Sequence, residues 1–392
     1  MRPLEGITVV SLEQAVAAPF ASRQLADLGA RVIKIERPKV GDFARAYDQS
    51  VKGESAYFVW LNRSKESLTL DVKHAEAKKI LAQLIERADV FMQNLAPGAA
   101  ARLGLDAQTL LARHPCLIVC DISGYGDSGP YAEKKAYDLL VQSESGVLSV
   151  TGTEETPSKV GISITDIGTG LHAYSAILAA LYQRERTGQG ARIEVTMFEV
   201  MTEWMNHPLY YSHFGGKAPR RNGPDHATIV PYGRFRAGDG KSVIFGIQNE
   251  REWANFCAKV LRQPALAADP RYDNNTKRTA ARAEVVALIE GVFSSLTAEE
   301  VIARLDAADI ANARLNSPNE VWDHPQLRAR GRWREVGSPA GVIPALLPPP
   351  TFSNFEARMD AIPKIGEHTD RILNELGYTA NSIASLRAEG AV

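Results

Sequence analysis

The fold is decided by the stretch Ile7–Glu36, ITVVSLEQAVAAPFASRQLADLGARVIKIE. It begins with Ile7–Leu12, a mostly apolar run that has the length of a buried strand. Small residues at Gln14–Pro19 form a loop that leads into a helix expected at about 20–28, and Arg31–Glu36 is a second strand. This order predicts a βαβ unit with two parallel, buried strands.

The alternation of strands and helices continues over roughly the first 200 residues, which is typical of a parallel sheet. Further strands are expected at 68–72, 89–93, 116–122 and 191–197. The pattern predicts an α/β fold built on a Rossmann-like, doubly wound sheet. Such sheets bind ligands at the carboxyl ends of their strands, which is where the loop Gln14–Pro19 lies.

The composition changes after Tyr211, which indicates a second domain. The next segment is rich in Gly, Pro and Arg, and Tyr232–Ile247 has the pattern of a hairpin, with helical patterns after it. The predicted organisation is a large domain at 1–211, a linker at 212–224, a small α+β domain at 225–325, a linker at 326–352 and a C-terminal return to the large domain at 353–392.

Charge and composition narrow the class of partner. Lys and Arg total 45, Asp and Glu total 46, and the formal net charge is −1, which argues against nucleic acid or an anionic membrane as the main partner. No apolar run approaches the roughly 20 residues that span a bilayer, and the N-terminus lacks the layout of a signal peptide. We therefore expect a cytoplasmic protein.

The three cysteines lack the spacing of metal ligands, and no acid or histidine cluster has it, so no metal site is expected. Cys116 and Cys120 flank the apolar run Leu117–Val119 and are expected in the core.

A second stretch, Gly161–Gly190, carries the candidate chemistry. Its sequence predicts a short strand that ends at Asp166, then two glycines, and then a helix over Leu171–Arg186. An Asp before a helix caps free backbone N–H groups. Alternatively, the same carboxylate is a nucleophile towards a thioester or anhydride, held ionised by the helix N-terminus, with glycines that let a ligand approach the backbone. Local sequence leaves both readings open.

The same stretch also fits a dinucleotide motif, because Gly168, Gly170 and Ala173 match G-x-G-x-x-A. That motif normally follows the first strand of the sheet, whereas here an Asp precedes it late in the domain. The context therefore disfavours NAD binding.

Four basic residues lie at or just beyond the ends of predicted strands or turns: Arg37, Lys73, Arg102 and Lys135. They are either solvated surface residues or a rim that binds phosphates.

Long motifs in a fixed order resemble one family. They are PLEGITVVSLEQAVAAPFASRQLADLGARVIKIERPKVGD, NRSKESLTLDVKHAEAKKIL, ADVFMQNLAPGAAARLGL, SGYGDSGPY, ITDIGTG and GEHTDRILNELGY. With these motifs the chain resembles the class III CoA-transferases, the CaiB–BaiF family, essentially from end to end. The resemblance implies an interlocked homodimer in which a Rossmann-like large domain takes both chain ends and two linkers reach a small domain. It also implies coenzyme A as part of the substrate and no tightly bound cofactor.

The resemblance assigns roles to individual residues. Asp166 matches the catalytic aspartate, which carries acyl and CoA groups in turn. The matches to CoA-contacting positions are Ala15, Val16, Arg37, Leu70, Lys73, Asn94, Leu95, Arg102 and Lys135.

The small-domain sequence bears on the substrate. GPDHATIVPYGRF stands where formyl-CoA transferase has a glycine-rich loop, so formyl-CoA and oxalate are not the expected substrates. DHATIVPYGRF and NEREW are similar to transferases that use succinyl-CoA with short dicarboxylic acids, such as glutarate, itaconate, mesaconate and citramalate. The positive partner expected for a second carboxylate is Arg220, Arg221 or Arg234.

Two alternatives stay open. The family includes α-methylacyl-CoA racemases, but the position of their catalytic His is occupied here by Tyr137, a poor base at neutral pH. The other alternative is a non-catalytic protein that binds CoA.

Overall fold

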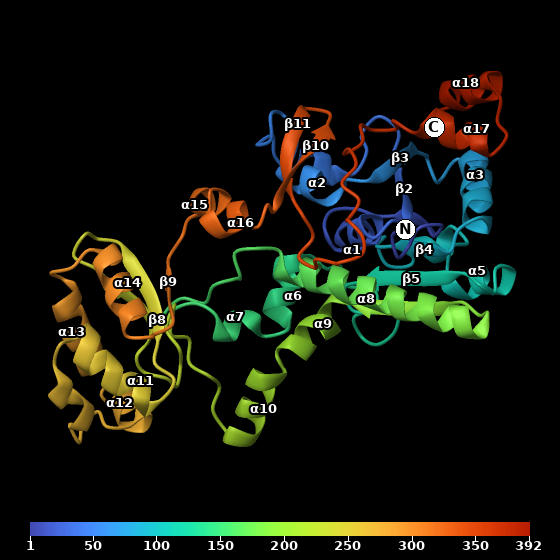
Figure 1. The fold of residues 1–392 in the computed structure, drawn as a ribbon. Helices are drawn as coiled ribbons and strands as arrows, with labels where there is room; N and C mark the ends of the chain where they lie inside the picture. Colours follow the sequence, from blue (N-terminus) through green and yellow to red (C-terminus); the bar gives the residue numbers. More distant parts are fainter. The chain divides into compact units, whose positions relative to one another are not determined.

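The computed structural model describes residues 1–392 and contains a six-stranded parallel sheet, in the order β3-β2-β1-β4-β5-β6 (Figure 1). The strands are β1 (Thr8–Leu12), β2 (Arg31–Glu36), β3 (Lys65–Thr69), β4 (Val90–Gln93), β5 (Ile118–Ser123) and β6 (Ala191–Thr196). The central strand β1 pairs with β2 on one side and β4 on the other, with Val10 opposite Ile33 and Phe91. The predicted doubly wound sheet is confirmed. Its strand order reverses between β1 and β4, the usual place for a ligand.

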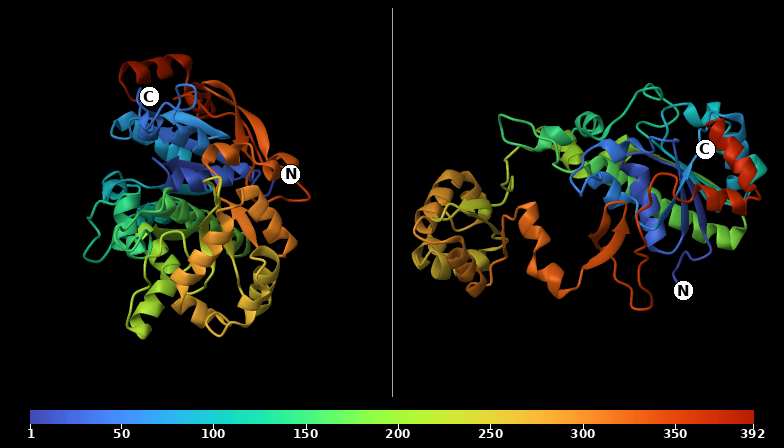
Figure 2. Two further views of the ribbon diagram at one scale, coloured as in Figure 1. Left: turned by 90° about the vertical axis from the view of Figure 1, so that its left-hand side faces the viewer. Right: turned by 90° about the horizontal axis from the view of Figure 1, so that it is seen from above.

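Helices cover both faces of this sheet because neighbouring strand residues point to opposite sides. Val9 and Met92 pack under α1 (Ala17–Asp27) and α8 (Ile164–Thr187). Val10 and Phe91 pack against the opposite layer. That layer consists of α3 (Ala75–Glu86), α5 (Ala107–Arg113), α17 (Thr369–Glu375) and α18 (Ala380–Ala388). Figure 2 shows from two further sides that the C-terminal helices stay beside α3.

The chain divides into two compact units. The first contains Met1–Val147, Val160–His207 and Leu327–Val392, and the second contains Leu148–Lys159 and Pro208–Gln326. The first unit has the remaining elements η1 (Phe43–Ala46), α2 (Ala56–Leu61), α4 (Ala99–Arg102), α6 (Asp138–Glu144), α9 (Met197–Trp204), β10 (Trp333–Ser338) and β11 (Gly341–Leu346). Elements at the division are α7 (Val147–Val150), α10 (Asn206–Gly215) and α16 (Pro325–Ala329). Strands β10 and β11 form an antiparallel hairpin inside the expected linker 326–352.

The second unit packs helices on a three-stranded antiparallel sheet, β7-β8-β9. Its strands are β7 (Tyr232–Arg236), β8 (Ser242–Gly246) and β9 (Asn312–Arg314). Its helices are α11 (Glu250–Asn255), the π-helix η2 (Phe256–Val260), η3 (Pro264–Ala268), α12 (Asn275–Ala280), α13 (Arg282–Phe293), α14 (Ala298–Ala307) and α15 (Pro318–Trp322). The predicted hairpin is confirmed by β7 and β8, whose Phe235 and Phe245 rings pack together at 4.5 Å.

Several local predictions were wrong. Helix α1 begins at Ala17 rather than at about residue 20, and β3 spans Lys65–Thr69 rather than 68–72. Residues 161–163 do not form a strand, and α8 begins at Ile164 rather than at Leu171. The early start has a physical cause: the N–H groups of Thr165 and Asp166 bond to Asp138, a side chain 27 and 28 residues earlier. Cys116 is exposed rather than in the core, because β5 starts only at Ile118.

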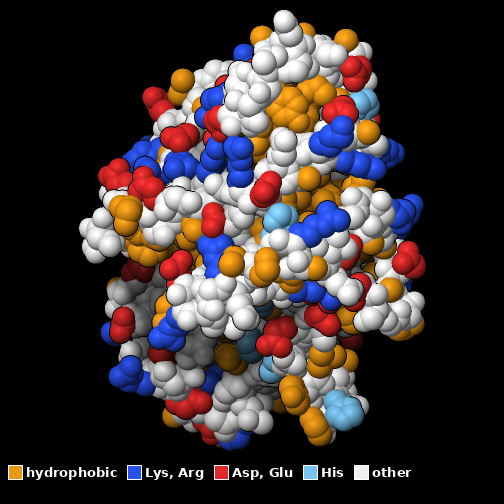
Figure 3. Space-filling model, turned by 90° about the vertical axis from the view of Figure 1, so that its right-hand side faces the viewer, with side chains coloured by type: hydrophobic (Ala, Val, Ile, Leu, Met, Phe, Trp, Pro, Cys, Tyr) orange, Lys and Arg blue, Asp and Glu red, His pale blue; other side chains and the backbone are white.

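The surface carries both signs of charge. On the face drawn in Figure 3, Lys and Arg side chains are interspersed with Asp and Glu. None of the helices combines the length and the apolar character that crossing a bilayer requires.

Candidate active site

The loop between β1 and α1 meets the end of β4 at the point where the strand order reverses. The N–H of Gln14 donates to Oδ1 of Asn94 at 2.9 Å, and Nδ2 of Asn94 donates back to the carbonyl of Gln14 at 2.9 Å. The next residue, Ala15, has a φ of 62°, in the left-handed region. A non-glycine residue there costs about 1–2 kcal/mol, so the surrounding structure must hold it.

A groove lies at the carboxyl ends of β1, β2 and β3, beside this loop. Its lining includes three residues from the predicted CoA set, Arg37, Leu70 and Leu95. The apolar side chains Leu12 and Ile35 line it as well. Three carboxylates also line it, but Glu13 and Asp42 are paired with Lys34, and Glu36 is paired with Arg45. Arg37 therefore remains the unpaired charge of the lining, which suits a ligand that carries phosphates.

The other predicted residues are not part of the lining of this groove. Ala15, Val16 and Asn94 belong to the loop contact just described. Lys73 follows β3, Arg102 ends α4, and Lys135 precedes α6. All three are exposed and none of them forms an ion pair, so their charges are available to phosphates. Arg37 donates only a weak bond, to the carbonyl of Gly41 at 3.4 Å.

Asp166 lies in the first turn of α8, and its carboxylate accepts no hydrogen bond from the protein. Burial raises its pKa to about 7, and the charge of Asp138 adds to this effect. The expectation that the helix N-terminus would keep Asp166 fully ionised at neutral pH was therefore wrong, because desolvation and a like charge outweigh the helix dipole. The side chain is thus free of structural partners, unlike a capping Asp.

Asp138 was missed in the sequence. Its Oδ1 accepts the N–H groups of Thr165 at 2.8 Å and Asp166 at 3.3 Å. Its Oδ2 accepts Nε2 of Gln142 at 2.7 Å, and Oε1 of Gln142 accepts the N–H of Val160 at 2.9 Å. The spacing of Asp138 and Gln142 on one helix face was the available signal. This chain of bonds fixes the start of α8 and hence the position of Asp166.

The two glycines after Asp166 serve helix packing rather than ligand approach. A Cβ on Gly168 would lie 2.9 Å from the Trp204 ring, and one on Gly170 would lie 2.4 Å from the carbonyl oxygen of Ala17. Both lie inside α8, so G-x-G-x-x-A is not a phosphate-binding turn here. The contact between Gly170 and Ala17 brings the first turn of α8 beside the β1–α1 loop.

Tyr47 was also missed. Burial, together with the charges of Asp42 and Asp166, raises its pKa to about 12. Its ring contacts those of Phe43 and Tyr57, with centroid distances of 5.7 and 5.5 Å. An aromatic wall with a neutral hydroxyl therefore lies within electrostatic range of Asp166.

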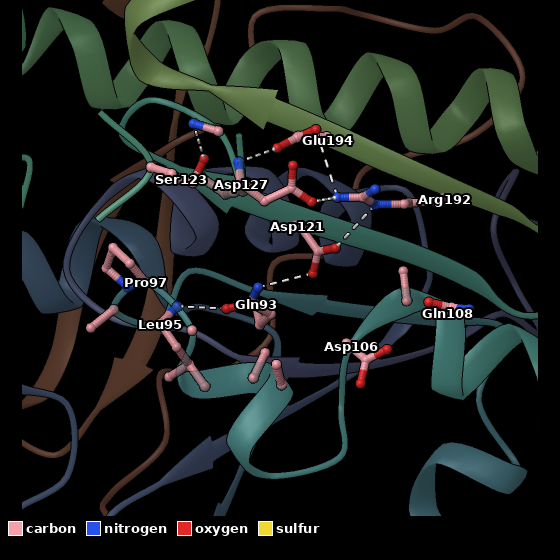
Figure 4. A pocket seen from close by; sticks show the side chains of 18 of the residues that line it. Gln93, Leu95, Pro97, Asp106, Gln108, Asp121, Ser123, Asp127, Arg192 and Glu194 are labelled. Atoms are coloured by element: carbon pink, nitrogen blue, oxygen red, sulfur yellow. Dashed lines mark hydrogen bonds and ion pairs between the residues drawn. The ribbon is translucent and has the colours of Figure 1, made fainter. Parts of the chain in front are cut away.

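A larger hollow, of about 440 Å³, lies beside β4, β5 and β6 (Figure 4). Arg192 forms ion pairs there with Asp121, Asp127 and Glu194. The surplus of carboxylates makes this hollow unsuited to a phosphate-bearing ligand. Gln93 connects it to the groove: Nε2 donates to Asp121 at 2.9 Å, and Oε1 accepts the N–H of Leu95 at 2.7 Å.

Comparisons with known proteins agree along the whole chain. The model of CoA-transferase family III matches residues 4–369. The chain is 34% identical to the succinyl-CoA:glutarate CoA-transferase of Mus musculus, covering 100% of this chain and 91% of that protein. It is also 34% identical to the succinate--glutarate CoA-transferase of Agrobacterium fabrum (strain C58), covering 95% and 96%. A crystal structure of a CAIB/BAIF family protein from Brucella suis is 34% identical, covers 96% of this chain and 99% of that one, and superposes with a TM-score of 0.86.

Proposed function

Because the chain belongs to CoA-transferase family III, we propose that it transfers CoA from succinyl-CoA to a short dicarboxylic acid. The observation that carries this proposal is the end-to-end similarity to two proteins named for transfer between succinate and glutarate. Glutarate is therefore the first candidate acceptor, and itaconate, mesaconate and citramalate are further candidates of similar length and charge.

The proposed nucleophile is Asp166. Its carboxylate attacks the thioester carbonyl of succinyl-CoA, which forms a mixed anhydride and releases the CoA thiolate. The thiolate attacks the carbonyl of Asp166, which forms an aspartyl thioester and releases succinate. The acceptor carboxylate then attacks this thioester, which forms a second mixed anhydride and releases the CoA thiolate. The thiolate finally attacks the acceptor's carbonyl, which forms the new acyl-CoA and frees the Asp166 carboxylate. A carboxylate without structural hydrogen bonds supports this role, and the half-buried position limits hydrolysis of the intermediates.

The proposed CoA site is the groove at the ends of β1, β2 and β3. Leu95, which is partly exposed, offers apolar surface to the adenine, and the buried Leu70 packs in the floor of the groove. The four unpaired basic residues Arg37, Lys73, Arg102 and Lys135 suit the pyrophosphate and the ribose phosphate.

We also propose a homodimer of this chain. None of the ten residues of α10 is buried, and Tyr210 and Phe214 are 63% and 77% exposed. Exposed aromatic residues of this kind are typical of surfaces that a partner covers. Sedimentation velocity at micromolar concentration tests this, and a monomer would contradict it.

The pH profile tests the environment of Asp166. The first acylation needs the ionised carboxylate, so its rate is expected to fall about tenfold per pH unit below the pKa near 7. Asp138→Asn removes the like charge but keeps an oxygen that can accept the N–H of Thr165. The acid limb of kcat is then expected to move to lower pH, while the larger effect of burial stays in place. Gln142→Ala is the control, because it removes a bond to Asp138 but keeps the charge of Asp138. An acid limb that does not move in Asp138→Asn would contradict the assigned role of the Asp138 charge.

The acceptor is tested by incubating the enzyme with succinyl-CoA and an equimolar mixture of acids, and identifying the acyl-CoA products by mass spectrometry. Dicarboxylates of four or five carbons are expected to dominate by at least about tenfold, since a second charge-assisted contact contributes about 1.5–3 kcal/mol. A preference for long monocarboxylates or for oxalate would contradict the proposal. Proton exchange in deuterated water without a second acid would select a racemase, and CoA binding without exchange would select a non-catalytic protein.

Hydrogen bonds within the second unit reduce the number of arginines that could bind the second carboxylate. Arg221 is committed, because its guanidinium donates to the carbonyls of Thr153 at 2.8 Å and Glu154 at 2.7 Å. Arg220 and Arg234 keep uncommitted guanidinium groups. In the same acid mixture, Arg220→Gln or Arg234→Gln should therefore lower dicarboxylate preference, whereas Arg251→Gln serves as a matched exposed control.

A further inference from the structure

We propose that Asp42 and Asn94 are positioning residues that clamp Ala15 in its left-handed conformation, and that this clamp sets the affinity for CoA. The inference deepens the proposed function, because it rests on the groove beside this loop being the CoA site.

The first half of the clamp is Asp42. Its Oδ1 accepts the N–H of Ala15 at 3.1 Å, which holds the residue whose φ is 62°. The same oxygen accepts the N–H of Ala44 at 2.9 Å and so caps η1. Without a bond to its N–H, Ala15 would favour an extended or right-handed conformation. A side chain from a distant turn therefore imposes the shape of the loop.

Asp42 is itself fixed by buried charge. The residue is 3% exposed, and its Oδ2 lies 2.8 Å from Nζ of Lys34. The same ammonium lies 3.3 Å from Oε1 of Glu13, which directly precedes the loop, and Lys65 lies 2.6 Å from that oxygen. One lysine thus anchors both the entrance of the loop and the group that holds its centre. The pairing also neutralises Glu13 and Asp42, which line the groove where an anionic ligand would lie.

The second half of the clamp is Asn94. Its oxygen and its nitrogen both bond to the backbone of Gln14, each at 2.9 Å. The resemblance assigned Asn94 to CoA contact, whereas its side-chain amide faces the loop backbone. We therefore infer that Asn94 acts on CoA through Gln14 and Ala15. Because Gln14 lines the groove, a shift of this backbone changes the wall that the ligand meets.

The test is a set of variants at the clamp and at the residue it holds. Asp42→Ala and Asn94→Leu each remove clamp bonds, Asp42→Asn keeps an acceptor for the N–H of Ala15, and Ala15→Gly removes the preference against the left-handed region. The measurements are the Kd for free CoA by calorimetry, and KM and kcat for succinyl-CoA.

Asp42→Ala and Asn94→Leu are expected to raise the Kd for CoA and the KM for succinyl-CoA about tenfold each, with a smaller effect on kcat. The Kd and KM of Asp42→Asn should lie between those of the loss variants and those of the wild type. Adding Ala15→Gly to either loss variant should recover most of the affinity, because glycine adopts the required φ without a clamp. Asn94→Leu leaves the buried ion pairs of Lys34 in place, so this variant still tests the clamp if Asp42→Ala does not fold.

Two results would overturn the clamp: folded loss variants that keep the wild-type Kd, or an Ala15→Gly effect that simply adds to theirs. Suppose instead that the wild type exchanges acyl groups, but the Arg37→Gln and Leu70→Ala variants bind CoA with the wild-type Kd. The groove would then not be the CoA site, and both the site and the clamp would be overturned. Loss of acyl exchange in the wild type, with CoA still bound, would count against the proposed function alone.

Discussion

Asp166→Ala is expected to reduce exchange between succinyl-CoA and glutarate by at least about a thousandfold, because it removes the atom that carries the acyl and CoA groups. The Kd for free CoA should stay within about threefold of the wild type, since the groove residues are untouched. Isotope exchange and calorimetry measure the two quantities. Asp166→Asn, which keeps the shape, should be equally inactive. Turnover at the wild-type rate in either variant would remove Asp166 from the mechanism.

The same position gives an independent readout of stability. The pKa of Asp166 is raised from 3.8 to about 7 in the folded chain. Ionisation of this carboxyl therefore lowers the free energy of unfolding as the pH rises between these two values. Asp166→Asn should therefore increase the free energy of unfolding by up to about 4 kcal/mol at pH 8, less what solvent screening of this half-buried group removes, and by less than about 1 kcal/mol at pH 4. Urea titrations at both pH values check the sign. A destabilised variant at pH 8 would mean that the carboxylate is structural.

Gly170→Ala is expected to lower the free energy of unfolding by about 2 kcal/mol or more, because the added methyl group overlaps packed backbone. Its Cβ would lie 2.4 Å from the carbonyl oxygen of Ala17 and 3.0 Å from Cβ of Phe20. Helix α1 would have to move, and the β1–α1 loop would move with it. We therefore expect weaker CoA binding as well, measured by calorimetry beside urea unfolding.

A matched control for Gly170→Ala exists in α13. Gly291 is also inside a helix, but a Cβ there would meet nothing within 4 Å. Gly291→Ala should therefore raise stability by up to about 1 kcal/mol through helix propensity. Equal effects at the two glycines would show that packing of α8 on α1 is looser than described.

The layers of the fold could be predicted from sequence because they rest on local patterns. The strand at Arg31–Glu36 has its predicted bounds, and the strand expected at 89–93 forms at Val90–Gln93. Hydrophobic periodicity and chain order are enough for such elements, since each buries its own face. The location of the groove could also be predicted, because parallel strands bring their carboxyl ends to one edge of the sheet.

The details of the site could not be predicted in the same way because distant side chains create them. The start of α8 depends on Asp138, and the conformation of Ala15 depends on Asp42. Gly168 and Gly170 resembled a ligand-binding loop, and only their neighbours in α9 and α1 reveal packing. The raised pKa of Asp166 likewise comes from burial and a neighbouring charge rather than from its place on a helix.

The central claim is that Asp166 carries the transferred group, and trapping tests it most directly. The enzyme is incubated with succinyl-CoA, treated with borohydride, digested and mapped by mass spectrometry. Reduction of the aspartyl thioester should convert Asp166 into homoserine, only when succinyl-CoA is present. Full exchange activity without any label at Asp166, or a label on a different carboxylate, would contradict the account.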